Sequence, residues 1–248
     1  IIGGGQLGSM LSQAAKKLNI KTTVYSDDVD APAQNFCDEF IHGLYEDKKK
    51  NLEFVSKVDV ITYEFENIPY ETLNEMNKLK SVLPKPSINR LIQHRIAEKD
   101  FINKLNIRTT RYVSIEKKTD IETLGDFLPG ILKTTTMGYD GKGQYPLKKI
   151  EDINPLNIDF SKGYILEKLV KLKKEISVIV SRFGINNFEI YEPIENTHQD
   201  QILKQSVIPA EISKQIADQS KDWATRIAEE LKYIGTLCVE FFIDRNEN

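Results

Sequence analysis

The segment ILKTTTMGYDGKGQ, residues 131–144, joins a short apolar strand that delivers Lys133 to a loop with three closely spaced glycines. Glycine lets a backbone approach an anion closely, and a lysine within the loop adds a point charge. The segment therefore predicts a cover over a phosphate group. It is not a Walker A loop, because that motif needs glycine at Thr136 and a hydroxyl residue at Gly143. A flexible hairpin with solvated charges is the alternative interpretation.

Two stretches that follow this loop have the composition of strands. Residues 164–170, YILEKLV, place Glu167 and Lys168 within an apolar run, and residues 173–182, KKEISVIVSR, contain Glu175. Acidic side chains beside strand backbone suit the edge of a base and the hydroxyls of a sugar. A glutamate next to two lysines is also ordinary at an exposed strand edge, so both interpretations of Glu175 stand.

A third strand is predicted at residues 237–244, LCVEFFID. Alternation places Glu240 on one face with Cys238 and Phe242, embedded among apolar residues. An unpaired carboxylate is costly to bury, so Glu240 needs either a basic side chain or a metal ion. Upstream, His198 lies among polar neighbours, which fits a ligand contact or an ordinary surface histidine.

The first hundred residues alternate between strand and helix signals. The expected strands are residues 1–2, 21–25 and 59–65, and apolar residues recur at helical spacing over 7–18. This alternation predicts an α/β fold that starts with a doubly wound parallel sheet, whose ligands lie at the carboxyl ends of the strands. Pro84 and Pro86 mark the expected end of this domain.

The turn between the first strand and the first helix has competing interpretations. Gly3, Gly5 and Gly8 satisfy G-x-G-x-x-G, and Asp27 stands about where dinucleotide-binding proteins carry the acid that holds the ribose. A nicotinamide cofactor would fit this pattern. A glycine-rich turn before a helix can also bind any phosphate, or serve only as a tight turn.

Composition narrows the classes of protein. The chain has 248 residues and 40% hydrophobic content, enough for one or two domains with a substantial core. Its 34 basic and 37 acidic residues give a net charge of −3, which argues against nucleic acid or a membrane surface as partner. Cys37 and Cys238 form no metal or disulfide motif, so we expect a cytoplasmic protein. No stretch is long enough to span a membrane, and the lack of an initial Met indicates a trimmed chain.

Together the motifs resemble the ATP-grasp superfamily and, within it, are similar to the 5-(carboxyamino)imidazole ribonucleotide synthase family. The similarity follows the order of the family's motifs across nearly the whole chain. The motifs are GGGQLG (3–8), ITYEFENIP (61–69), the cluster of Gln93, Arg95, Glu98 and Lys99, LKTTTMGYDGKGQ (132–144), EKLVKLKKEISV (167–178), PIENTHQDQIL (193–203) and GTLCVEFF (235–242).

The resemblance implies a Rossmann-like pre-ATP-grasp domain over residues 1–86 and an ATP-grasp domain over 87–248, with a lid subdomain at about 108–170. It also implies roles for individual residues. The implied ATP contacts are Arg95, Lys133, Gly138, Tyr139, Asp140, Gly141, Lys142, Gly143, Gln144, Glu167, Lys168, Leu169, Val170, Glu175 and His198. The implied contacts to the second substrate are Gly5, Gln6, Leu7, Glu64, Glu66 and Tyr139, and Glu240 matches one carboxylate of a magnesium site.

The chemistry that the resemblance implies is an ATP-dependent carboxylation in purine biosynthesis. ATP phosphorylates bicarbonate to carboxyphosphate. The exocyclic amine of 5-aminoimidazole ribonucleotide then captures the carboxyl group or the carbon dioxide that carboxyphosphate releases. Lys133 and Lys142 then act catalytically by offsetting developing negative charge, together with Mg²⁺. The partners are small molecules, and the family resemblance suggests a homodimer.

Two features depart from the family pattern. Residues 135–137, Thr-Thr-Met, replace a stretch that usually ends in glycine, and the chain stops at residue 248, before the family's second metal-ligand strand and C-terminal domain. We therefore expect the chain alone to turn over poorly. The alternatives are another ATP-grasp ligase, such as a formate-dependent purine enzyme or a biotin carboxylase, a nicotinamide oxidoreductase, and a non-catalytic nucleotide-binding module.

Overall fold

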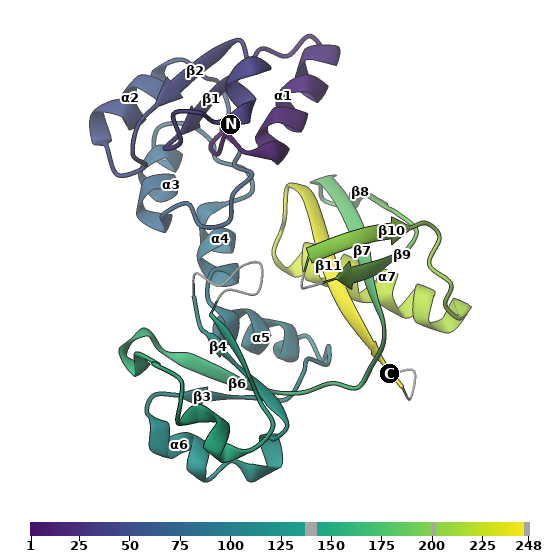
Figure 1. Cartoon of the computed structure of the whole chain (residues 1–248). Coiled ribbons are helices and arrows are strands. Elements are labelled where there is room, and N and C mark those ends of the chain that lie inside the picture. The colour runs from purple at the N-terminus through teal and green to yellow at the C-terminus, as the bar shows by residue number, and fades with distance from the viewer. Residues whose placement is uncertain (137–142, 200–201, 246–248) are drawn as a thin grey trace. The chain divides into compact units, whose positions relative to one another are not determined.

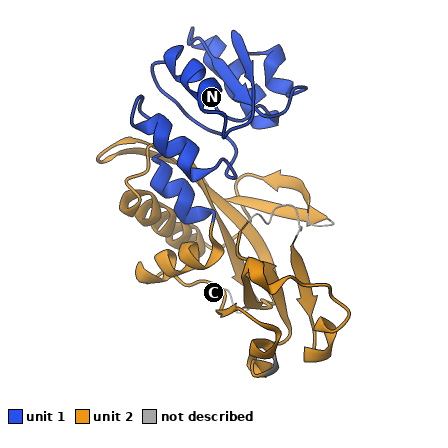
Figure 2. Ribbon diagram, turned by 90° about the vertical axis from the view of Figure 1, so that its left-hand side faces the viewer, with its two compact units in different colours: residues 1–93 blue, residues 94–248 orange. Residues whose placement is uncertain are grey.

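The computed structural model describes residues 1–136, 143–199 and 202–245. The chain forms two compact units, residues 1–93 and 94–248 (Figure 2). The division falls after Gln93 rather than after Pro86, because Pro86 is the first residue of a helix, α4 (Pro86–Ile92), that packs on α3 (Tyr70–Asn77) of the first unit.

The first unit is built on a parallel sheet (Figure 1). Strand β1 (Thr23–Ser26) pairs in parallel with β2 (Glu39–His42). Single parallel bridges then join Ile2 to Tyr25 and Tyr63, and Ile61 to Val82. The strand positions can be numbered along the chain as Ile2, β1, β2, residues 61–63 and Val82. Their order across the sheet is then 3-2-1-4-5, which is the order of a doubly wound fold. The predicted doubly wound sheet is therefore confirmed, although the strand expected at 59–65 is reduced to two bridges.

The helices of the first unit follow from local signals. The unit contains α1 (Gln6–Lys17), a 3₁₀ turn η1 (Pro32–Asn35) and α2 (Lys48–Ser56), besides α3 and α4. The carboxylate of Asp47 caps α2 by accepting the backbone N–H groups of Lys49 and Lys50 at 2.9 and 3.2 Å. Pro86 stands at the first position of α4, where its missing N–H costs nothing.

Helix α1 packs inward through its small residues. Gly8, Ser9 and Ser12 are its buried positions, whereas Leu7 and Met10 are 59% and 57% exposed. A Cβ at Gly8 would lie 2.6 Å from the carbonyl oxygen of Gly3, so no larger residue fits there. The predicted helix is confirmed, and its apolar residues line its outer side.

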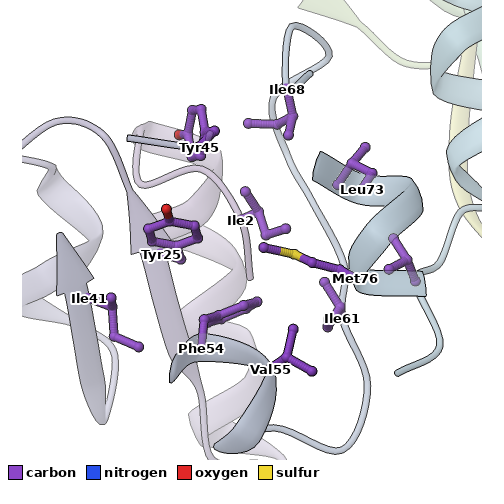
Figure 3. Packing of buried hydrophobic residues seen from close by; sticks show 11 residues of the cluster. Ile2, Tyr25, Ile41, Tyr45, Phe54, Val55, Ile61, Ile68, Leu73 and Met76 are labelled. Carbon is purple, nitrogen blue, oxygen red and sulfur yellow. The ribbon is translucent and has the colours of Figure 1, made fainter. Parts of the chain in front are cut away.

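The core of the first unit lies between the sheet and α2 and α3. Figure 3 shows the rings of Tyr25 and Phe54 and the side chain of Met76 within this cluster. The Tyr25 and Phe54 ring centroids are 5.6 Å apart. The buried members of the cluster are Ile2, Tyr25, Ile41, Tyr45, Phe54, Val55, Ile61, Ile68, Leu73, Met76 and Val82. Burial of this apolar surface holds the turn at residues 3–5 in place, because Ile2 immediately precedes it.

In the second unit, the described residues form two antiparallel sheets. It begins with α5 (Arg95–Lys104), and the first sheet has the order β3 (Tyr112–Ile115), β6 (Tyr164–Lys168), β4 (Gly130–Thr134), β5 (Gln144–Leu147). Helix α6 (Lys118–Glu122) and the 3₁₀ turns η2 (Gly125–Phe127), η3 (Ile150–Ile153) and η4 (Phe160–Lys162) connect these strands. The residues of one face, among them Leu132, Tyr164 and Leu166, form a buried apolar cluster.

The second sheet has the order β10 (Ile202–Val207), β9 (Ile194–Gln199), β7 (Leu172–Gly184), β11 (Gly235–Asp244), and β8 (Asn187–Ile190) also pairs with β7. Helix α7 (Lys214–Glu230) packs on β7 and β11. Trp223 of this helix lies against Phe241 of β11, with ring centroids 6.2 Å apart. The strands expected at 164–170, 173–182 and 237–244 are therefore present as β6, β7 and β11.

Candidate nucleotide and substrate sites

A chain of two ion pairs crosses the first sheet of the second unit. The ammonium of Lys133, on β4, lies 2.7 Å from Glu167 Oε2, and the ammonium of Lys99, on α5, lies 3.3 Å from Glu167 Oε1. The Glu167 side chain is only 7% exposed. Burial raises the pKa of this carboxyl, but the two ammonium groups outweigh burial, so the pKa lies below its usual value. Glu167 is thus a carboxylate shared between two cations.

Arg95 is held at the end of β4. Its backbone N–H donates to the Thr135 carbonyl at 2.9 Å, and its side-chain Nε–H donates to the Thr134 carbonyl at 3.1 Å. These contacts fix the first turn of α5 against the strand that carries Lys133. The two basic residues that sequence analysis assigned to the phosphates, Arg95 and Lys133, therefore belong to one local structure.

Glu98 adds a second carboxyl to the same cluster. Burial raises the pKa of Glu98, although the nearby cations Lys99 and Arg95 oppose this. The charges of Glu167 and Glu240 raise it further, so Glu240 of β11 lies within electrostatic reach of α5. The contacts of the cluster bring together residues from α5, β4 and β6.

The base of the glycine-rich segment is a hairpin between β4 and β5. Lys133 pairs with Gln144 across it, and the Thr134 N–H donates to the Gly143 carbonyl at 3.0 Å. Gly143 has φ +69°, and a Cβ there would lie 2.7 Å from Thr134 Oγ1, so the position requires glycine. Five residues predicted to contact ATP lie outside the described residues: Gly138, Tyr139, Asp140, Gly141 and Lys142.

The segment that follows Glu167 uses part of its backbone internally. The Lys168 N–H donates to the Arg111 carbonyl at 2.9 Å, and the Leu169 N–H donates to the Pro129 carbonyl at 3.0 Å. The Leu169 side chain is 48% exposed, and Val170 is half-buried. Any base edge that meets this segment must use its remaining backbone groups, since these two N–H donors are occupied.

Glu175 and His198 form a pair on neighbouring strands of the second sheet. Glu175 lies on β7 and His198 on β9, and Glu175 Oε2 is 2.6 Å from His198 Nδ1. Both side chains are about 30% exposed, at 29% and 30%. The structure therefore brings together two residues that the sequence assigned separately to a nucleotide, and leaves both within reach of solvent.

Glu240 differs from its sequence interpretation in one respect. It shares a face of β11 with Cys238 and Phe242, as alternation predicted, but this face is exposed, and Phe242 is 50% exposed. The Glu240 carboxylate is therefore not embedded among apolar residues, and the expectation that burial demands a cation was wrong. Glu240 lies opposite Ser177 of β7, two register positions from the pairing of Phe242 with Glu175.

In the first unit, the glycine-rich turn contacts an acid. The Gly5 N–H donates to Glu64 Oε1 at 3.0 Å, and Gly3, at φ +97°, has no room for a Cβ because Glu64 lies against it. Burial raises the pKa of Glu64, the Gly5 N–H lowers it, and the charge of Glu66 raises it, with a net rise. A carboxylate thus occupies a backbone donor that the sequence pattern offers to a phosphate.

The other predicted residues of this site that the structure describes are exposed. Gln6 and Leu7 begin α1 and face outward, and Glu66 is exposed on the loop after the last bridge of the sheet. Gln93 holds this loop, because its side-chain amide donates to the carbonyls of Glu66 and Ile68 at 2.6 and 2.7 Å.

Sequence analysis gave Lys99 no role, although it named Lys99 within a motif. Its spacing from Arg95 was the available signal, because residues four apart in a helix lie on one face. Among the described residues, no group of three or more histidines, cysteines or acids is arranged to hold a metal ion. In the same part of the chain, no helix has the length and hydropathy to cross a membrane.

Comparison with known proteins identifies the two units. The ribonucleotide synthetase preATP-grasp domain family matches residues 1–93, and the ATP-grasp domain family matches residues 100–248. The N5-carboxyaminoimidazole ribonucleotide synthase of Brucella melitensis is 37% identical over 98% of this chain and 68% of its own length. The chain belongs to the N5-carboxyaminoimidazole ribonucleotide synthase family of ATP-grasp proteins.

Other members of the family support this assignment. The N5-carboxyaminoimidazole ribonucleotide synthase of Staphylococcus aureus strain COL is 36% identical over 99% of the chain, which spans 66% of that relative's length. The crystal structure of the N5-carboxyaminoimidazole synthetase from Staphylococcus aureus complexed with ADP has a TM-score of 0.92 and 35% identity, covering all of this chain and 66% of its own. The fold is thus a pre-ATP-grasp domain followed by an ATP-grasp domain, as the sequence predicted.

Proposed function

We propose that the protein carries out the ATP-dependent carboxylation of 5-aminoimidazole ribonucleotide with bicarbonate, giving N5-carboxyaminoimidazole ribonucleotide, ADP and phosphate. The observation that carries this proposal is the match to N5-carboxyaminoimidazole ribonucleotide synthases across both units at 36–37% identity. The solved synthetase from Staphylococcus aureus is complexed with ADP, which supports a nucleotide site in this chain.

The nucleotide is proposed to bind beside the Lys99–Glu167–Lys133 chain. Lys133 and Arg95 meet the phosphates, and the glycine-rich segment after β4 covers them and contributes Lys142. Glu175 accepts hydrogen bonds from the ribose hydroxyls, and His198 makes a further contact with the nucleotide. The segment from Glu167 to Val170 meets the adenine. The support is that Lys133, Glu167 and Arg95 lie within one cluster, and that Glu175 and His198 are 2.6 Å apart.

The ribonucleotide is proposed to bind at the turn of the first unit, through Gly5, Gln6, Leu7, Glu64 and Glu66. Because Glu64 already accepts the Gly5 N–H, its second carboxylate oxygen suits a hydroxyl or amine donor of the substrate better than a phosphate. The same contact disfavours the nicotinamide alternative, since a carboxylate at this turn repels a pyrophosphate.

The described residues supply only part of the ligands that a magnesium ion would need. Mg²⁺ is commonly held by one or two carboxylates together with the phosphates of a substrate, and Glu240 offers one exposed carboxylate near the cluster of α5. We propose that Glu240 and the nucleotide phosphates would hold the ion, which would neutralise phosphate charge. Lys133, Arg95 and Lys142 orient the triphosphate and offset the charge that develops on it, while the hairpin excludes water from carboxyphosphate.

Phosphate release by the full-length protein tests the proposal, with the ribonucleotide and bicarbonate each supplied or omitted. We expect release to require both. A rate unchanged without the ribonucleotide would contradict the assigned substrate and favour another ATP-grasp ligase. Hydride transfer to a nicotinamide cofactor would contradict the whole assignment. Light scattering tests the homodimer that we propose by family resemblance, and fractionation of cells tests the cytoplasmic location.

A further inference from the structure

We propose that Lys99 is a positioning residue of the nucleotide site. Its ammonium holds one oxygen of Glu167, so that Glu167 orients Lys133 while the three groups keep a net positive charge. The inference rests on the proposed nucleotide function of this cluster. It concerns a side chain to which neither the motif pattern nor the comparison with relatives assigns a role.

Lys99 gives the cluster of Lys133, Glu167 and Lys99 a net positive charge. Glu167 is a single carboxylate between two ammonium groups, at 2.7 Å from Lys133 and 3.3 Å from Lys99. Lys133, Glu167 and Lys99 together carry one positive charge. Without Lys99, Lys133 and Glu167 would form a closed neutral pair, and the attraction for a phosphate would fall accordingly.

Lys99 is held between the ring of Tyr112 and the carboxylate of Glu167. Its ammonium lies 5.6 Å from the centroid of the Tyr112 ring, and Tyr112 is the register partner of Glu167 on β3. The Tyr112 hydroxyl donates to Asp100 and accepts from the Asn103 side-chain amide at 3.2 Å, and both residues lie on α5. The ring is thereby fixed to the helix that carries Lys99. The Lys99 side chain is only 17% exposed, so it is packed between ring and carboxylate rather than free in solvent.

The carboxylate of Glu167 is held by a different lysine at each oxygen. Each of its oxygens has a different cation, so the plane of the carboxylate is fixed from both sides. Lys133 is 14% exposed and is held by the oxygen that faces it. If Lys99 were absent, both oxygens would be available to Lys133, and its ammonium could turn away from a phosphate. Lys99 therefore acts on the nucleotide through Glu167 and needs no contact with it.

Nucleotide affinity of the 248-residue chain tests this, with calorimetry of ATP and adenosine binding. We expect Lys99→Met to weaken ATP binding about tenfold, or about 1.4 kcal/mol, and to leave adenosine binding within about twofold. Lys99→Arg keeps the charge and should retain most of the ATP affinity. Lys104→Met is the matched control, because Lys104 is an exposed lysine of the same helix.

The outcomes separate the inference from the proposed function. Equal losses for ATP and adenosine, or an unchanged ATP affinity in Lys99→Met, would overturn the inference alone. A wild-type chain that binds no ATP would count against both. A second measurement needs no nucleotide: the carboxyl titration of Glu167, followed by ¹³C NMR, should move to higher pH in Lys99→Met and stay in place in Lys104→Met. A titration that stays in place in both variants would overturn the coupling.

Discussion

Gly5 and Glu64 lie 59 residues apart in the sequence, yet the Gly5 N–H donates to Glu64 Oε1 at 3.0 Å. This hydrogen bond joins the glycine-rich turn to the loop after the fourth strand position of the sheet. It brings two motifs of the family into contact and places a carboxylate at the start of α1. Consequences for the stability of the first unit follow from the protonation of Glu64.

Glu64→Gln should stabilise the chain at neutral pH. The pKa of Glu64 is raised in the folded state, so the folded chain binds this proton more tightly than the unfolded chain does. The contribution of Glu64 to stability is therefore greatest in acid and falls as pH rises from about 4.5 through the raised pKa. We expect the melting temperature of Glu64→Gln to rise by about 1–3 °C at pH 7 and to stay unchanged at pH 4.

Glu46→Gln provides the control for this prediction, because Glu46 is an exposed glutamate of the same unit. Differential scanning calorimetry of both variants across this pH range gives the comparison. A lower melting temperature of Glu64→Gln at pH 7 would mean that the charged hydrogen bond to Gly5 outweighs the cost of burial.

Gly143→Ala should destabilise the second unit. The residue has φ +69°, which L side chains rarely adopt, and the new Cβ would lie 2.7 Å from Thr134 Oγ1. We expect a loss of about 1–3 kcal/mol in the free energy of unfolding, measured by urea titration. Gly125→Ala is the matched control, because nothing lies within 4 Å of the position of its Cβ. Equal effects of the two substitutions would contradict the argument from backbone geometry.

Glu175→Ala should remove the discrimination between ribose and its deoxy forms. If Glu175 accepts the ribose hydroxyls, the wild-type chain should bind ATP about tenfold more tightly than 2′,3′-dideoxy-ATP, and the variant should bind both alike. Glu189→Ala, at an exposed glutamate of β8, should keep the preference. A preference that survives in Glu175→Ala would assign the ribose to another group.

Removal of magnesium should affect Glu240→Gln less than the wild type. The proposed ion would be held by Glu240 and the phosphates, so EDTA should weaken ATP binding by the wild-type chain about tenfold and change little in the variant. Glu230→Gln, at an exposed glutamate of α7, should respond to EDTA as the wild type does. Calorimetric titrations with and without MgCl₂ measure this. Equal responses of wild type and Glu240→Gln would place the ion elsewhere.

The sequence predicted the strands and the alternation of their faces well. Alternation reports which residues share a face, and the predicted faces of β7 and β11 agree with the structure. It does not report which face is covered, and for this reason the burial of Glu240 was predicted wrongly. Covering depends on the elements that pack on a strand, and these are distant in the sequence.

The contact between Lys99 and Glu167 also could not be predicted from the sequence. It depends on β6 lying between β3 and β4, an order that does not follow the chain, and on α5 crossing the face that carries Lys133. The motif contains the required residue types, but the sequence alone does not determine which lysine pairs with which glutamate. Only the strand order selects one of them.

Helix α1 inverts the usual relation between hydrophobicity and mutational tolerance. Its inner positions, Gly8 and Ser12, touch at short range, with the Ser12 hydroxyl donating to the Gly8 carbonyl at 2.8 Å. Its leucines at 7 and 11 are exposed, and so is Leu18, which caps its C-terminus. In a saturation library selected for folding of this chain, glycine and serine should therefore be the restricted positions, and the leucines the permissive ones. A substitution matrix based on hydrophobicity would rank these positions in the opposite order.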